Sequence, residues 1–116
     1  MISNYQKGIA SEKKAFLYLR KKGFLLIRHR LKTPYGEIDL LMKKQDLFLV
    51  AEVKQRSSIN QALYAIDIKQ QKRIIDAFCW WQSIEAISLD CHVRFDVIVI
   101  DQHGGLNHLE NAFQLC

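Results

Sequence analysis

Residues 36–55 read GEIDLLMKKQDLFLVAEVKQ, and this stretch decides the fold. Two apolar runs flank the polar residues 43–46, a pattern that predicts strands over 37–42 and 47–55 joined by a hairpin-like turn. The second strand is apolar through Ala51 and alternates afterwards, which is typical of a strand in the centre of a sheet. The stretch therefore predicts the middle of a β-sheet.

A helix is expected before these strands. Ser3 and Gln6 form the capping-box pattern of a helix start, and Gly23 marks its end. Between them, spacings of four and three residues place one stripe on a single helix face: Tyr5, Ile9, Glu12, Phe16 and Leu19. Glu12 is either tolerated near the helix start, where the dipole favours an acid, or meets a polar or positive group that offsets the cost of burying it. A strand over 24–27 should follow the helix.

The second half of the chain predicts one long helix and a further strand. The helix follows a polar loop at 56–60 and ends near 81–83, and the strand covers 93–100. Its distance from the strand at 47–55 suits a crossover connection, so the two are expected to be parallel. Residues 106–113 form a short strand or a turn. The helix should bury Ile66, Ile74, Ala77, Phe78 and Trp81, with Trp80 facing elsewhere.

Together these elements predict a single α/β domain over residues 1–116. The expected order is α-β-β-β-α-β, with a mixed central sheet of about four to five strands flanked by helices. Uninterrupted apolar runs are too short for a membrane span, and no signal-peptide pattern begins the chain, so no membrane partner is expected. An odd, widely spaced set of three cysteines, Cys79, Cys91 and Cys116, is typical of reduced thiols in a cytoplasmic protein.

The net charge of +5 is unevenly distributed. Residues 1–58 hold 13 Lys and Arg against 5 Asp and Glu, whereas residues 59–116 hold 4 against 7. Between residues 13 and 32 there are eight basic residues and no acid. Such a block is typical of a surface that faces a polyanion, although solvated basic faces are also common.

Acidic and basic side chains interrupt the apolar strands in a pattern that indicates a metal site. Residues two apart on a strand share a face, so Glu52 and Lys54 lie side by side, and the hairpin brings Asp39 next to Glu52. Two packed carboxylates are unfavourable unless a cation lies between them, and oxygen ligands suit Mg²⁺. The backbone carbonyl of Val53 is a further candidate ligand. Lys54 would then orient the attacking water and stabilise charge on a phosphate.

Each of these short patterns also recurs by chance in surface ion pairs, which contribute little to stability. Arg94 and Asp96 share a strand face, and a structural ion pair is favoured there over Asp96 as a further metal ligand. Glu12 would complete the acidic cluster or bind a water of the metal.

Asp39 followed by Glu52-Val53-Lys54 resembles the PD-(D/E)XK nuclease signature. The whole chain is similar to the YraN-like family of predicted endonucleases (UPF0102), which is distantly related to archaeal Holliday-junction resolvases. The stretches that carry this resemblance are Gly8-x-x-x-Glu12-x-x-Ala15, Gly36-Glu37-Ile38-Asp39-Leu40, Glu52-Val53-Lys54-x-Arg56, Arg94-Phe95-Asp96-Val97 and Asn111-Ala112-Phe113.

The resemblance implies a restriction-endonuclease-like core, with Glu12, Asp39, Glu52 and Lys54 on the active-site positions and Mg²⁺ or Mn²⁺ as cofactor. The expected function is a Mg²⁺-dependent endonuclease or nuclease-like protein acting on DNA rather than RNA, with branched or structured DNA as one candidate substrate. Cutting a junction needs two sites and hence a homodimer. The alternatives are a non-catalytic nucleic-acid-binding module with the same fold and a protein-interaction domain. The residues expected to contact nucleic acid are Lys13, Lys14, Arg28, Arg30, Lys32, Tyr35, Arg56, Lys69, Lys72 and Arg73.

Overall fold

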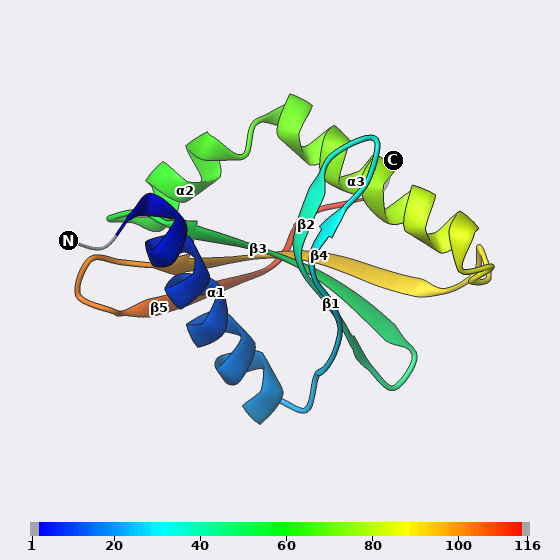
Figure 1. Cartoon of the computed structure of the whole chain (residues 1–116), viewed down its shortest axis with the longest axis horizontal. Coiled ribbons are helices and arrows are strands. Elements are labelled where there is room, and N and C mark those ends of the chain that lie inside the picture. The colour runs from blue at the N-terminus through cyan, green and yellow to red at the C-terminus, as the bar shows by residue number, and fades with distance from the viewer. Residues whose placement is uncertain (1–2, 115–116) are drawn as a thin grey trace.

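A five-stranded mixed sheet forms the centre of the structure, a computed structural model that describes residues 3–114. Helix α1 covers one face of the sheet, and α2 and α3 cover the other (Figure 1). This is the predicted α/β class, and it is compatible with a restriction-endonuclease-like core. The elements are α1 (Asn4–Lys21), β1 (Leu25–Lys32), β2 (Glu37–Lys44), β3 (Leu47–Gln55), α2 (Ile59–Ala65), α3 (Ile68–Ile84), β4 (His92–Ile100) and β5 (Leu106–Phe113).

The strands lie in the sheet in their sequence order, from β1 to β5. Strands β2 and β3 form the hairpin predicted from residues 36–55, with Leu41 opposite Val50. Strands β3 and β4 are parallel, as the crossover distance predicted, and all other neighbours are antiparallel. The sequence predicted a strand or a turn over 106–113, and this stretch is the edge strand β5.

Alternation along β3 produces two apolar cores, one on each face of the sheet. Phe48 and Val50 pack on the α3 side with a cluster of aromatic rings, whereas Leu49 and Ala51 pack on the α1 side. The aromatic cluster joins Phe78, Trp81, Phe95 and Phe113. Because successive side chains of a strand point to opposite faces, both cores depend on the register of this one strand.

Helix α1 begins and ends where the sequence predicted. The Ser3 side chain accepts a hydrogen bond from the Gln6 backbone N–H at 3.1 Å, and the Gln6 side chain accepts one from the Ser3 N–H at 3.0 Å. Gly23, just past the helix, has a φ of 97°, a conformation that glycine adopts without steric cost.

The prediction of one long helix before β4 was wrong, because α2 and α3 are separate helices. Ile66 leaves the helical conformation at φ −109° and ψ 74°, and the Asp67 side chain accepts a hydrogen bond from the Gln70 N–H at 2.8 Å. An aspartate at this position starts a new helix in preference to continuing the old one. The predicted strand over 24–27 was also too short, since β1 extends to Lys32.

The prediction that one of the two adjacent tryptophans is buried and the other faces elsewhere is confirmed. Trp81 is buried in the aromatic core, while Trp80 is half-buried at its border. Cys79 and Cys91 are free thiols, and Cys116 lies outside the described residues. Within residues 3–114, every helix is too short or too polar to span a bilayer.

Candidate metal and nucleic-acid site

The Asp39 carboxylate lies where β2 and β3 separate. Backbone pairing between the two strands reaches Leu40 opposite Ala51 and does not continue to Asp39. There the Asp39 Oδ2 accepts a hydrogen bond from the Val53 N–H at 2.8 Å. The side chain thus satisfies a backbone donor at the end of the ladder and is held against β3.

Glu52 is the neighbouring acid, and it is almost completely buried, with 2% of the residue exposed. Its Oε1 atom is buried without a hydrogen-bond partner. Burial raises the pKa of the Glu52 carboxyl well above its ordinary value, the proximity of Asp39 raises it further, and Lys54 opposes both effects. The Asp39 and Glu52 carboxyls are therefore neighbours, as the hairpin predicted, and Lys54 only partly offsets the effect of their proximity.

The pleat of β3 divides its last residues between the two faces of the sheet. Glu52 and Lys54 continue the face of Phe48 and Val50, which α3 covers. Val53 packs with the α1-side core, and Gln55 shares its face. The acid and the ammonium of the Glu-x-Lys sequence consequently lie together on the α3 side.

The donor set suits a hard divalent cation. Mg²⁺ usually keeps several waters and binds through one or two carboxylates together with substrate phosphates. Asp39 and Glu52 supply two such carboxylates, and the unpartnered Glu52 Oε1 is an atom that a cation would satisfy. Among residues 3–114, no three His, Cys, Asp or Glu side chains come together as a metal-ligand group, so a third protein side chain does not join this pair.

Glu12 belongs to a different cluster. Its buried carboxylate accepts two hydrogen bonds from the Arg30 guanidinium, from Nε to Oε1 and from Nη2 to Oε2, each 2.9 Å long. The His29 Nε2 lies 2.7 Å from the same Oε1. The Arg30 guanidinium also lies over the Tyr5 ring, 4.9 Å from its centroid. The structure therefore explains the acid in the apolar stripe of α1 by its partners on β1.

Arg30 reaches Glu12 from an unusual backbone conformation. Its φ is 53°, which is uncommon for a residue with a side chain. The pairs His29–Leu40 and Leu31–Ile38 place Arg30 across the ladder from Asp39. The Glu12 cluster thus borders the Asp39 end of β2, although Glu12 does not join the acids there.

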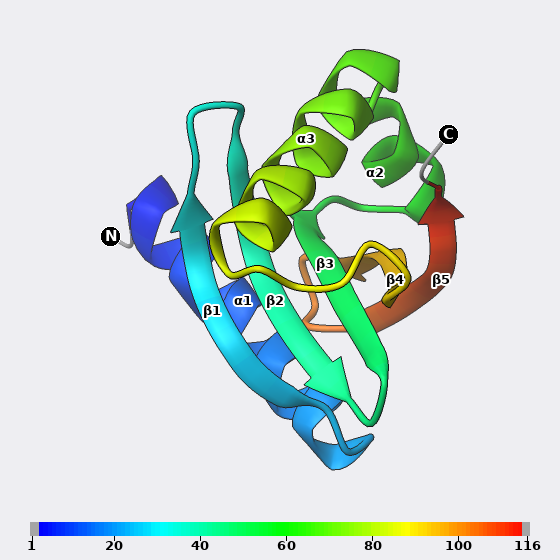
Figure 2. The ribbon, with the colours of Figure 1, turned by 90° about the vertical axis from the view of Figure 1, so that its right-hand side faces the viewer.

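The basic residues expected to contact nucleic acid divide between the two faces of the sheet. Lys13 and Lys14 lie on α1, and the exposed Lys69, Lys72 and Arg73 lie on α3, across the sheet. The tip of the β1–β2 hairpin stands beside α3 (Figure 2), where Gly36 packs against the Arg73 Cβ and backbone. This packing brings the exposed Tyr35 and Lys32 near Lys69, Lys72 and Arg73, which we call the α3 group.

Some of the side chains that were expected to contact nucleic acid already have partners within the protein. The Arg28 guanidinium lies 3.6 Å from Glu85, Lys72 lies 3.7 Å from Asp76, and Arg56 donates a hydrogen bond to the Gln55 carbonyl at 2.8 Å. These three side chains are exposed, and such surface pairs exchange readily for a phosphate partner.

Asp96 forms the structural ion pair that the sequence favoured. It is fully buried and accepts two hydrogen bonds of 2.8 Å from Arg94. The His108 Nε2 lies 2.7 Å from it, and the Tyr18 hydroxyl lies 2.9 Å from the His108 Nδ1. Burial raises the pKa of Asp96, but the hydrogen bonds from His108, Arg94 and the Asn111 N–H outweigh this, and the net pKa is lowered. Sequence reasoning missed His108 and Tyr18, which come from distant parts of the chain.

Comparison with known proteins places the chain in a family. The model of the uncharacterised protein family UPF0102 matches residues 11–100. The chain belongs to family UPF0102. It is 38% identical over 112 residues to a UPF0102 protein of Rhodopseudomonas palustris (strain BisA53), an alignment that covers 97% of this chain and 86% of the relative. A UPF0102 protein of Nitrobacter winogradskyi is 36% identical over 97% of this chain and 95% of its own length. A relative in Bradyrhizobium diazoefficiens is 35% identical over 97% of this chain and 84% of its own length.

Proposed function

We propose that this protein is a Mg²⁺-dependent endonuclease of the PD-(D/E)XK type that acts on DNA in the cytoplasm. One observation carries the proposal. The Glu52 carboxylate is buried beside Asp39 with an unpartnered oxygen, and Lys54 lies on the same face of β3. Stability alone gives no reason to bury an acid against another acid, so the arrangement is one that a bound cation would justify.

Asp39 and Glu52 would hold the ion, and the backbone carbonyl of Val53 is the further candidate ligand. When bound, Mg²⁺ supplies charge stabilisation for a phosphodiester and lowers the pKa of a coordinated water. The Val53 N–H fixes the orientation of the Asp39 carboxylate, and burial of Glu52 keeps bulk water from competing for it. Lys54 then donates hydrogen bonds to the scissile phosphate as negative charge develops on its oxygens.

Hydrolysis adds one water across a P–O ester bond and leaves a phosphate end and a hydroxyl end. The basic side chains around the site would supply the sequence-independent part of binding through the phosphate backbone. The α3 group and the hairpin tip are best placed for this, because they share the face that carries Glu52 and Lys54. The choice of DNA over RNA rests on the resemblance to the nuclease signature.

The direct test incubates the purified protein with duplex, single-stranded and four-way-junction DNA, and with RNA, in Mg²⁺ or Mn²⁺. We expect cleavage of a DNA substrate that EDTA abolishes. Asp39→Asn and Glu52→Gln should each reduce the rate by at least about a hundredfold, because each removes a ligand of the ion. Asp46→Asn, in the turn at the other end of the same hairpin, should cleave as the wild type does.

Lys54→Ala should also lose activity, and Lys21→Ala, an exposed lysine of α1, is its matched control. If no nucleic acid is cut, or if the Asp39 and Glu52 variants cut as well as wild type, the protein is not a nuclease of this kind. Cleavage of RNA with no cleavage of DNA would refute the assigned substrate.

A non-catalytic nucleic-acid-binding module is the second candidate, and the position of Glu12 favours it. The residue that the resemblance places in the active site, Glu12, is bound to Arg30 and His29, which leaves two acids at the candidate site among residues 3–114. A binding module would bind DNA equally well with and without EDTA, and Asp39→Asn would not weaken its binding. Its affinity would fall steeply with salt, since phosphate contacts release counterions.

A further inference from the structure

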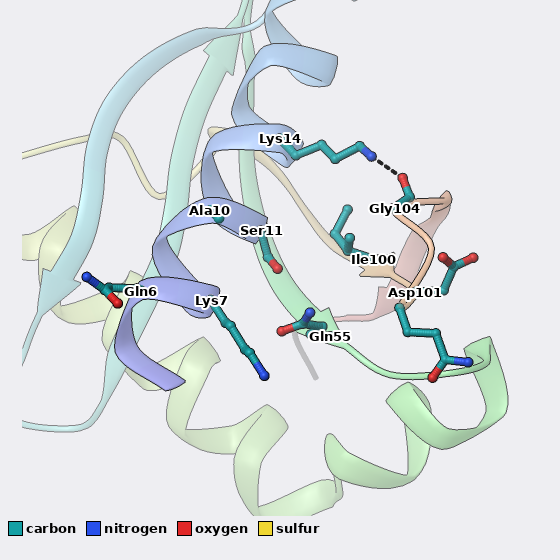
Figure 3. Close-up of a pocket in the computed structure, with 10 residues that line it drawn as sticks. Gln6, Lys7, Ala10, Ser11, Lys14, Gln55, Ile100, Asp101 and Gly104 are labelled. Carbon is teal, nitrogen blue, oxygen red and sulfur yellow. Dashed lines mark hydrogen bonds between the residues drawn. The ribbon is translucent and has the colours of Figure 1, made fainter. Parts of the chain in front are cut away.

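A pocket of about 610 Å³ opens between α1 and the turn from β4 to β5, at the carboxyl ends of β3 and β4 (Figure 3). Lys7, Ser11 and Lys14 line it from α1, and Gln55 and Ile100 line it from the sheet. In α/β sheets, ligands bind preferentially at the carboxyl ends of parallel strands. The two acids of the candidate metal site are not among its lining residues.

The walls of the pocket offer hydrogen-bond donors and positive charge. Two glutamine amides line it, from Gln55 and Gln102, together with the lysines Lys7 and Lys14, whereas the Gln6 amide points away from it toward the helix start. The Lys14 ammonium donates a hydrogen bond to the Gly104 carbonyl, which ties the β4–β5 turn to α1 across the mouth of the pocket (Figure 3).

Asp101 is an acid in the wall of the pocket, and it is engaged by its own turn. Its Oδ1 accepts hydrogen bonds from the N–H groups of His103 and Gly105, each 2.8 Å long, and these bonds lower the pKa of Asp101. Because Gln6 is held in the capping box and Lys14 by Gly104, the polar side chains left for a ligand are Lys7, Gln55 and Gln102, which suit an anionic group with hydrogen-bonding edges. Glutamine amides are suited to the edge of a nucleobase, and lysines to a phosphate.

The pocket borders the end of β3, one residue beyond Lys54 and three residues beyond Glu52. Gln55 follows Lys54 directly, and neighbouring residues of a strand are about 3.3 Å apart along it. Lys54 faces α3 and Gln55 faces α1, so a nucleic-acid strand that crosses the end of β3 meets both side chains. The volume falls in the range of sites that enclose one small ligand, and a double helix, whose major groove alone is about 12 Å wide, does not fit.

We propose that this pocket seats one unpaired nucleotide next to the scissile phosphate, so that the protein selects DNA with a single-stranded segment over blunt duplex. The assignment rests on the proposed function, since it names the substrate of the same site. It explains why the end of β3 carries an amide toward α1 beside an ammonium toward α3.

The test measures affinity in EDTA, where no cleavage occurs, for two DNA duplexes of equal charge. One carries a short single-stranded overhang, and the other carries an abasic overhang of the same length. We expect the base-bearing overhang to bind about tenfold more tightly, a difference of about 1.4 kcal/mol. Ala10→Trp should abolish this preference, because Ala10 lines the pocket and is exposed enough to accept a ring that fills it.

Leu17→Trp places the same ring at an exposed position of α1 outside the pocket and should keep the preference. Gln55→Ala is a second, smaller change that should reduce the preference for the base-bearing overhang. Equal affinity for the two overhangs, a preference that survives Ala10→Trp, or no binding of any DNA would overturn the assignment. Competition by a free deoxynucleoside monophosphate as strong as by the overhang would also overturn it, since the pocket would then serve a small metabolite.

The two proposals can fail separately. If the overhang preference follows the pocket variants but no DNA is cut in Mg²⁺, the pocket assignment stands and the nuclease proposal fails. If DNA is cut but the base-bearing and abasic overhangs bind alike, the nuclease proposal stands and the pocket assignment fails.

Discussion

The Glu12 carboxylate on α1 and the Arg30 guanidinium on β1 form two parallel hydrogen bonds of 2.9 Å. Such a two-point pair fixes both side chains in one orientation. Gly8, one turn before Glu12, keeps room for the pair, because a Cβ there would lie 3.2 Å from the Arg30 Nη2. Glu12 thus joins the first helix to the strand that runs past Asp39.

Removing this carboxylate should destabilise the fold. We expect Glu12→Ala to lower the free energy of unfolding by about 3 kcal/mol, since it leaves a guanidinium with one-quarter of its side chain exposed without its partner. Urea unfolding of the two proteins measures the difference. Lys72→Ala is the control, because it breaks an exposed pair and should cost less than about 0.5 kcal/mol. A loss of similar size in both variants would refute the structural role of Glu12.

The backbone of Arg30 gives a second prediction, which separates strain from side-chain contact. Arg30→Ala and Arg30→Gly both lose the bonds to Glu12, but only glycine relieves the φ of 53°. Arg30→Gly should therefore be more stable than Arg30→Ala, by about 1 kcal/mol in urea unfolding. Lys32 has no positive φ, so there Lys32→Ala should be more stable than Lys32→Gly, because glycine weakens a strand. The same order at both positions would show that Arg30 is not strained.

The parts of the fold that follow from local pattern could be predicted, and the part that depends on a cap could not. The apolar runs on either side of residues 43–46 define β2 and β3, and the length of the connection indicates the parallel β4. The break between α2 and α3 was missed because apolar periodicity continues across it. Asp67 followed by Gln70 was the signal, an N-cap with a partner three residues on.

In the candidate site too, local pattern predicts the regular strand positions and misses the contacts that depend on irregular backbone. The pleat alone places Glu52 beside Lys54 and opposite Asp39, and the structure brings these residues together. The partners of Glu12 and Asp96 could not be found in this way, because they depend on irregular strands. Arg30 reaches Glu12 through a positive φ, and His108 reaches Asp96 across a shift of register between Phe95 and Val97. Pairing rules for regular strands do not place such contacts.

Glu52 gives a prediction for the pH dependence of stability. Its pKa in the folded protein is raised above the ordinary value of 4.5, so between these two pKa values the folded state binds more protons than the unfolded state. The contribution of Glu52 to stability is therefore fully present below about pH 4.5 and is lost as the pH rises toward the folded pKa. Glu52→Gln, which cannot ionise, should remove this decline and be more stable than wild type at the upper end. Urea unfolding across a pH series measures both effects.

The exposed Glu37 of β2 serves as the control for this experiment, and Glu37→Gln should show the same decline as wild type. If Glu52→Gln is instead less stable than wild type at every pH, the Glu52 carboxylate is not an unrelieved charge in the folded protein.

Binding of Mg²⁺ should be accompanied by release of protons, because an acid with a raised pKa must ionise before it can bind a cation. Calorimetric titration in two buffers of different ionisation enthalpy measures the number of protons released. We expect up to one proton per ion at a pH below the folded pKa of Glu52, and none for Glu52→Gln. Added Mg²⁺ should also raise the thermal stability of wild type and leave that of Asp39→Asn unchanged, since a ligand that binds only the folded state stabilises it by mass action. Calorimetry that detects no binding, or binding of the same strength to wild type and Asp39→Asn, would show that the two carboxylates are not a metal site, and the burial of Glu52 would then need another explanation.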